Sequence, residues 1–181
     1  MPKLNATVVP VTPFQQNCSI FWNDDDKKAT VIDPGGDVER IREILDQAGL
    51  TVEAILLTHG HIDHAGGADE LRELTGAKIT GPHEADRMLL ENLEKQGDLY
   101  GMEGVRNVAP DRWLAEGDTI AIAGQDFDVF HAPGHSPGSV IFVSKPLGFA
   151  IVGDVLFAGS IGRTDLPGGS HESLLSSIRD K

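Results

Sequence analysis

Short apolar runs separated by turn-forming residues occupy the first third of the chain. Three of these runs are rich in β-branched or aromatic side chains and predict strands at residues 6–11, 17–22 and 29–33. After Asp33-Pro34-Gly35-Gly36, apolar residues recur at alternating spacings of three and four, which predicts a helix that ends at Gly49. Residues 54–57 are apolar without alternation, as expected of a strand that is covered on both faces.

The rest of the chain alternates predicted helices and strands. Helices are expected at about 67–75 and 84–93, and a last one begins near Glu172, whereas residues 97–117 are expected to be irregular. Further strands are expected at residues 78–80, 118–122, 126–131, 139–144 and 149–153. Strands in two clusters with interspersed helices predict a single α/β domain over residues 1–181, with helices flanking a two-sheet core.

Composition and charge narrow the class of protein. The chain has 40% apolar and 24% charged residues, and its single cysteine, Cys18, is expected to be a small buried apolar residue. No basic and apolar leader follows Met1, and no apolar run approaches the roughly 20 residues that span a bilayer, so a cytoplasmic protein without membrane contact is expected. The net charge of −13, with no basic stripe, argues against a nucleic-acid partner.

Three of the seven histidines lie within six residues, directly after the predicted buried strand, in the run Thr58-His59-Gly60-His61-Ile62-Asp63-His64. In an extended segment, side chains two residues apart share a face, so His59 and His61 can converge on one ion. The adjacent Asp63 and His64 need a bend and suit a second ion, about 3.5–4 Å from the first. Imidazoles combined with carboxylates favour two divalent metal ions, with zinc expected and iron or manganese as alternatives.

Two later segments have the same layout, a strand followed by a candidate ligand. Pro133-Gly134-His135 lies in a loop made rigid by prolines and glycines, and His135 is interpreted as a ligand, whereas His131 is expected to pack or to support the site. Asp154 follows the apolar run 149–152, which predicts a buried strand, and a buried carboxylate without a partner would be costly, so a metal partner is inferred. Core packing is preferred over a place in a substrate groove for Tyr100, Met102 and Trp113.

Together these motifs resemble the metallo-β-lactamase superfamily, and they are most similar to its small bacterial glyoxalase II-like members. The closer likeness rests on residues 131–139 and 157–169. The resemblance implies an αββα four-layer sandwich, in which two packed mixed β-sheets are flanked by helices. It assigns His59, His61 and His135 to a first metal. It assigns Asp63 and His64 to a second metal, and makes Asp154 the bridge between the two.

The resemblance also implies a hydrolase that cleaves a small-molecule thioester, most typically S-D-lactoylglutathione, by a metal-bound hydroxide that Asp63 orients or deprotonates. Arg163 matches a basic residue with which the family holds the glutathione moiety, although a brace to Asp165 is an equal alternative. The family places a last metal-binding histidine in a Pro-Gly-His segment after the final helix. No such segment is found here, so a C-terminal truncation is expected. No oligomeric state is predicted.

Two other functions fit the same residues. A persulfide dioxygenase of the same superfamily would hold one iron with His59, His135 and Asp154, and it would not need the missing histidine. The segments around residues 160–161 and 166–169 favour the glyoxalase branch over it. The third hypothesis is a non-catalytic metal-binding fragment with an incomplete second site.

Overall fold

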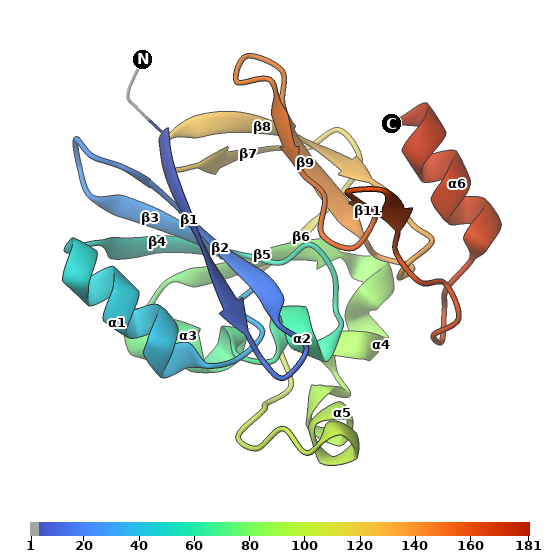
Figure 1. The fold of residues 1–181 in the computed structure, drawn as a ribbon, viewed down its shortest axis with the longest axis horizontal. Coiled ribbons are helices and arrows are strands. Elements are labelled where there is room, and N and C mark those ends of the chain that lie inside the picture. Colours follow the sequence, from blue (N-terminus) through green and yellow to red (C-terminus); the bar gives the residue numbers. More distant parts are fainter. Residues whose placement is uncertain (1–3) are drawn as a thin grey trace.

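A computed structural model describes residues 4–181 and shows two β-sheets packed against each other (Figure 1). The first sheet has six strands in the order of the chain, antiparallel from β1 to β3 and parallel from β3 to β6. Its strands are β1 (Leu4–Val11), β2 (Gln16–Asn23), β3 (Lys28–Ile32), β4 (Thr51–Leu56), β5 (Lys78–His83) and β6 (Arg112–Leu114).

The second sheet has four strands in the order β10-β9-β8-β7, all antiparallel. They are β7 (Thr119–Ile122), β8 (Gln125–His131), β9 (Val140–Ser144) and β10 (Phe149–Ile151), and a separate hairpin pairs β11 (Leu156–Phe157) with β12 (Ser160–Ile161). The expectation of two mixed sheets is therefore wrong for this one. Its strands are joined by direct connections without crossover helices, and only antiparallel pairs can be joined in that way.

Helices cover the outer faces of both sheets. α1 and α3 lie against the first sheet, on the side away from the second, and α6 lies beside the second sheet (Figure 1). The helices are α1 (Val38–Ala48), α2 (Ile62–Ala65), α3 (Ala68–Thr75), the 3-10 turn η1 (Glu84–Asp86), α4 (Arg87–Leu90), α5 (Leu93–Tyr100) and α6 (His171–Asp180). No helix in residues 4–181 is long and apolar enough to cross a membrane.

Three apolar layers separate the four structural layers. Because side chains alternate along a strand, Ile20 and Phe21 of β2 face opposite layers. Ile20 packs toward α1 and α3, Phe21 lies between the two sheets, and a third layer around Leu174 joins the second sheet to α6. This arrangement confirms the predicted four-layer sandwich, and it confirms residues 54–57 as part of a mostly buried central segment.

Three sequence expectations need correction. The helix expected at 84–93 is broken into η1, α4 and the start of α5, and residues 97–117, expected to be irregular, include the end of α5 and all of β6. The run 149–153 is not a buried strand, because β10 pairs with β9 alone at the sheet edge and Phe149 is 36% exposed.

The prediction that no leader follows Met1 concerns a segment whose first residues, 1–3, lie outside the described part of the chain.

The candidate ligands all follow strand ends at one edge of the sandwich. β4 leads into the loop that carries His59 and His61, and β8 leads into the loop that carries His135. Asp154 follows β10, and Asp33 follows β3 directly. Side chains that are far apart in sequence are thereby gathered on one face, which is the usual place for a ligand site in a layered α/β fold.

Candidate metal centre

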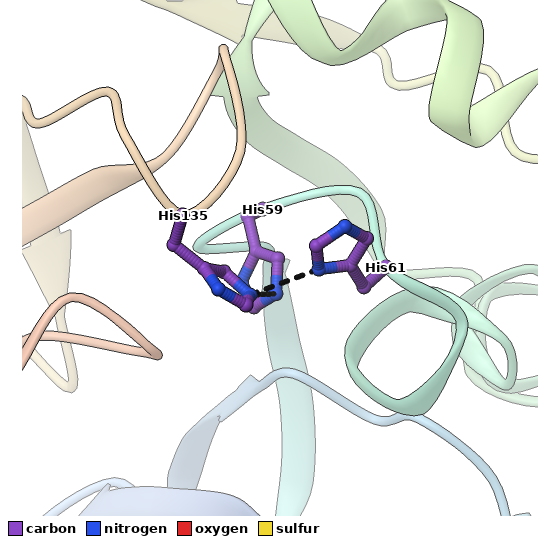
Figure 2. A group of neighbouring side chains, drawn as sticks. All are labelled: His59, His61 and His135. Atoms are coloured by element: carbon purple, nitrogen blue, oxygen red, sulfur yellow. Dashed lines mark hydrogen bonds between the residues drawn. The ribbon is translucent and has the colours of Figure 1, made fainter. Parts of the chain in front are cut away.

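Three imidazole rings converge at this edge, from two different loops (Figure 2). Nε2 of His135 lies 2.9 Å from Nδ1 of His61 and 3.2 Å from Nε2 of His59. All three side chains are buried. The three nitrogens lie within 4.8 Å of one another, so each can supply one ligand to a common ion.

Hydrogen bonds behind two of these rings fix which nitrogen is free. Nδ1 of His135 donates to the carbonyl oxygen of Arg163 at 2.8 Å, so its Nε2 carries the lone pair. Nδ1 of His59 lies 3.1 Å from Oγ1 of Thr58, and that hydroxyl already donates to Asp33. The hydroxyl therefore accepts from His59, which leaves the lone pair of His59 on Nε2. Both lone pairs point to the same place.

A second cluster of polar groups surrounds His64, on the single helical turn α2. Nδ1 of His64 lies 2.9 Å from Oδ2 of Asp33. Its Nε2 faces two further carboxylates, at 3.6 Å from Oδ2 of Asp63 and 3.2 Å from Oδ1 of Asp154. The helical turn supplies the bend that the adjacent Asp63 and His64 need.

Asp154 lies between the two groups of side chains. One carboxylate oxygen is 3.2 Å from Nε2 of His64, and the other is 3.5 Å from Nε2 of His135. A single carboxylate therefore reaches both the three-histidine cluster and the cluster around His64. This is the geometry that a bridging ligand requires.

The donor set fits divalent cations. In a tetrahedral zinc site with Zn–N distances of about 2.0–2.1 Å, the nitrogens lie roughly 3.3 Å apart. The spacings of 2.9 and 3.2 Å around His135 are close to that value. In the second cluster, Nε2 of His64 is buried and makes no hydrogen bond of good geometry, although two carboxylates lie beside it. The first cluster therefore directs nitrogen lone pairs at one place, and the carboxylates of the second need a positive charge among them.

The electrostatics of the two clusters differ. Burial, together with the neighbouring histidines, lowers the pKa of His59 well below its usual range and that of His61 to about 3, so these rings are neutral and able to bind a cation. Burial would also lower the pKa of His64, but Asp33, Asp154 and Asp63 outweigh it and raise that pKa to about 10. A proton on His64 thus supplies, in the metal-free protein, the positive charge that the three carboxylates require.

Comparison with known proteins identifies the family. Residues 11–181 match the profile described as the metallo-beta-lactamase superfamily. The chain belongs to the metallo-beta-lactamase superfamily. A curated relative, the hydroxyacylglutathione hydrolase GloC of Haemophilus influenzae, is 45% identical over 179 residues, which cover 98% of this chain and 84% of that protein.

Two solved structures have the same fold as this chain. The BLEG-1 B3 metallo-beta-lactamase superposes with a TM-score of 0.87 at 40% identity, over 98% of this chain and 85% of that one. TTHA1623, solved in a di-iron-bound form, superposes with a TM-score of 0.84 at 34% identity, over 96% of this chain and 84% of that one. The resemblance stated from the motifs is therefore confirmed at the level of family and fold.

The structure brings all six sequence-predicted metal ligands of this superfamily member into one region, as two groups joined by Asp154. Sequence reasoning missed two buried aspartates behind them. Asp33 holds His64 and Thr58, and Asp86 holds the two ligand loops. A signal for Asp33 existed, since it is the last residue of a predicted strand and Asp154 directly follows another, but its place before Pro34 made it resemble an ordinary turn residue.

The other residues singled out from the sequence have contacts that show their roles. His131 stacks on His83 with ring centroids 3.9 Å apart, and its Nε2 lies 2.8 Å from the carbonyl oxygen of Pro137, so it braces the ligand loop as expected. Cys18 is fully buried, as expected. Trp113 packs against the core, whereas Tyr100 lines a cavity beside the metal centre and is 47% exposed. Core packing was thus the wrong expectation for Tyr100.

An apolar cavity of about 460 Å³ opens beside the three-histidine cluster. It reaches His61, His135 and Asp154 at its inner end. Its walls come mainly from α4, α5 and the two loops that face them: Phe14, Met88, Leu89, Leu99, Tyr100 and Leu166. Arg163 also lines it, with its guanidinium bound to both oxygens of Asp165 at 2.7 Å.

Proposed function

We propose that this metallo-hydrolase of the metallo-beta-lactamase superfamily cleaves a thioester, with a glutathione thioester of the S-D-lactoylglutathione type as the substrate. The observation that carries the proposal is the pair of ligand clusters joined by Asp154, at the inner end of an apolar cavity. The identity of 45% with a hydroxyacylglutathione hydrolase supports the choice of thioester.

In this proposal His59, His61 and His135 would hold the first divalent cation, Asp63 and His64 would hold the second, and Asp154 would take part in both sites. Two cations held in this way would make water acidic enough to attack a carbonyl near neutral pH and would polarise that carbonyl. Zinc fits the imidazole and carboxylate donors, and iron or manganese fits them as well. His64 would bind the second cation in its neutral form, so its proton would go to solvent.

Asp63 is the residue of this chain that we assign to proton handling. Its side chain is 24% exposed, against 4% for His64, and it lies beside both His64 and the cavity. Burial raises its pKa, and the nearby Asp154 adds to that effect although His64 opposes it. A bound cation would oppose that rise, so the assignment rests on position. The carboxylate of Asp63 lines the cavity beside His64, where it can orient the attacking water and take its proton.

The cavity residues would hold the substrate. Its apolar walls remove water from the acyl group and from the scissile carbonyl, which strengthens every electrostatic interaction at the metal centre. Arg163 is placed to exchange Asp165 for a carboxylate of the thiol carrier, because a guanidinium can bind either carboxylate in the same two-point geometry. Both partners of that pair are exposed, so the exchange costs little.

The test is thiol release from S-D-lactoylglutathione by the protein loaded with zinc, iron or manganese, with metal content measured on the same sample. Ellman's reagent can report the thiol, since the protein's own Cys18 is buried. We expect thiol release that depends on bound metal.

Arg163→Ala is expected to raise KM with little change in kcat. Arg179→Ala is the matched control, since Arg179 pairs with Asp180 through two hydrogen bonds on α6.

Other outcomes would replace the proposal. No thiol release from this substrate or from other acyl thioesters, with two metals bound, would overturn thioester hydrolysis. One bound iron with oxygen uptake in the presence of glutathione persulfide would identify a dioxygenase. Cleavage of the β-lactam nitrocefin without thioester cleavage would identify a lactamase.

A further inference from the structure

The carboxylate of Asp86 is fully buried and connects the two loops that carry the three-histidine cluster. Its Oδ2 accepts from the backbone N–H of Gly60 at 2.8 Å, between His59 and His61. The same oxygen accepts from the hydroxyl of Ser136 at 2.7 Å, and Oδ1 accepts from the N–H of Gly138 at 2.5 Å. Ser136 and Gly138 follow His135, so one side chain bonds both ligand loops.

Asp86 does not cap the helix that follows it, although its position in the chain suggests that role. It stands immediately before α4, where an aspartate usually accepts a hydrogen bond from the first turn of the helix. No such bond is formed here. The carboxylate turns away from the helix and toward the ligand loops, where all of its hydrogen-bonding partners lie.

Both loops approach Asp86 at glycines. A Cβ atom at Gly138 would lie 2.6 Å from Cγ of Asp86, and a Cβ atom at Gly60 would lie 3.3 Å from its Cβ. Real Cβ atoms do not come as close as the first of these distances, so a larger residue at 138 would force the loop and the carboxylate apart. The two glycines and the aspartate therefore form one tightly packed unit.

We propose that Asp86 is a positioning residue that sets the spacing between His135 and the pair His59 and His61. This inference rests on the assignment of those three histidines to one metal ion. The hydrogen bonds of Asp86 go to Gly60, Ser136 and Gly138 and not to a ligand side chain. Asp86 acts through the backbone on either side of the ligands, and a metal site is sensitive to shifts of well under 1 Å in the groups that hold its ligands.

A carboxylate suits this task better than its amide. All three partners of Asp86 donate hydrogen bonds, and an ionised carboxylate accepts through both oxygens. In Asp86→Asn the amide nitrogen would face a donor on one loop or the other, so one loop must move away. The loops stay joined elsewhere, because the N–H of Val140 donates to the carbonyl oxygen of Thr58 at 2.8 Å, so the variant has a way to fold.

The experiment measures metal binding by the folded protein rather than activity. Co²⁺ is titrated into wild type and Asp86→Asn in competition with a chromophoric chelator, and the visible spectrum of bound Co²⁺ is recorded. We expect about 10–100-fold weaker binding at the tighter site and an altered spectrum, as is typical when a group that supports metal ligands is lost. Asp111→Asn is the matched control, since Asp111 accepts from the N–H of Ile79 away from the loops.

A purely structural role predicts a different result. It would lower the urea midpoint of the metal-free protein and leave Co²⁺ affinity and spectrum as in wild type, and that result would overturn the proposal. If Asp86→Asn does not fold, Ser136→Ala decides, since it removes one tie to one loop. It is expected to weaken Co²⁺ binding about fivefold, which corresponds to the roughly 1 kcal/mol of one hydrogen bond. Unchanged Co²⁺ binding would contradict the proposed role of Asp86.

The outcome is independent of the substrate. A wild-type protein that binds Co²⁺ tightly but cleaves no thioester would remove the proposed function and leave the role of Asp86 standing. If the wild-type protein hydrolyses the thioester while Asp86→Asn keeps normal Co²⁺ binding, the proposed function stands and the role of Asp86 is overturned.

Discussion

Oδ2 of Asp33 lies 2.9 Å from Nδ1 of His64, and both side chains are almost fully buried. The same carboxylate accepts from the backbone N–H of Thr58 at 2.7 Å and from its hydroxyl at 2.6 Å. Asp33 therefore orients the ring of His64 so that Nε2 faces Asp63 and Asp154, and it anchors the residue that precedes His59. One aspartate at the end of β3 supports both clusters.

Replacing Asp33 by asparagine is expected to weaken the second metal site more than the first. An amide has one acceptor oxygen and would place an N–H group against one of three donors, so His64 loses its fixed orientation. We expect the purified variant to hold about one metal rather than two, and its free energy of unfolding to fall by about 1–3 kcal/mol. Elemental analysis and urea denaturation measure the two effects.

Asp37→Asn is the matched control for this change. Asp37 also accepts from a backbone N–H, that of Thr12 at 2.7 Å, but it does not contact the ligands. It should keep the metal content of the wild type. An Asp33→Asn protein with both metals at wild-type affinity would show that Asp33 does not orient His64.

Loss of Asp154 and loss of His64 should have different effects on metal content. Asp154 reaches both clusters, so Asp154→Ala is expected to release both metals on dialysis. His64 belongs to the second cluster alone, so His64→Ala should weaken mainly that site. The measurement is the number of metal equivalents per chain in each variant. Loss of both metals in His64→Ala, together with one metal retained in Asp154→Ala, would contradict the assignment.

Cys18 provides a pH-dependent prediction away from the metal centre. Burial raises the pKa of its thiol well above the usual range, and the nearby Asp33 raises it further. The unfolded chain has an ordinary cysteine pKa of about 8.5, so above that pH the unfolded state loses a proton that the folded state keeps. Stability is therefore lost as pH rises from about 8.5, by up to roughly 1.4 kcal/mol per pH unit from this group.

Cys18→Ala separates this contribution from that of other groups that titrate in the same range, His64 among them. The slope of unfolding free energy against pH, from urea titrations at pH 8 to 10, should be smaller in the variant. In the wild type, iodoacetamide should alkylate the native protein far more slowly than the urea-unfolded one. Equal alkylation rates, or equal slopes in the two proteins, would show that the thiol is accessible.

The amino-acid sequence was sufficient to predict the fold class and to single out six side chains that the structure gathers into one region. They were identifiable because they stand on three short segments that each follow an apolar run, such as His59 after Leu57. Asp33 and Asp86 were not identifiable in this way. Each is a lone aspartate before a turn or a helix, and only the three-dimensional packing shows what its carboxylate contacts.

Errors in the predicted elements have a similar physical origin. The interruption after α4 depends on a contact that is distant in sequence, since the N–H of Val108 donates to the carbonyl oxygen of Leu90. The apolar run at β10 matches a buried strand in its residue types, but its place at the edge of the second sheet leaves Phe149 exposed. Local pattern carries no information on either relationship.

Gly35→Ala is expected to disturb the second metal site although Gly35 binds nothing there. A Cβ atom at this position would lie 1.5 Å from the carbonyl oxygen of Asp63, so the backbone of α2 must move. We expect loss of the second metal before the first and a free energy of unfolding lowered by about 1–3 kcal/mol, the usual cost of overpacking. Gly36→Ala is the neighbouring control, because its Cβ would meet side-chain atoms rather than backbone, with Cγ2 of Thr12 at 3.0 Å and Cε of Met102 at 3.8 Å. Wild-type metal content in Gly35→Ala would show that the position of α2 does not govern the second site.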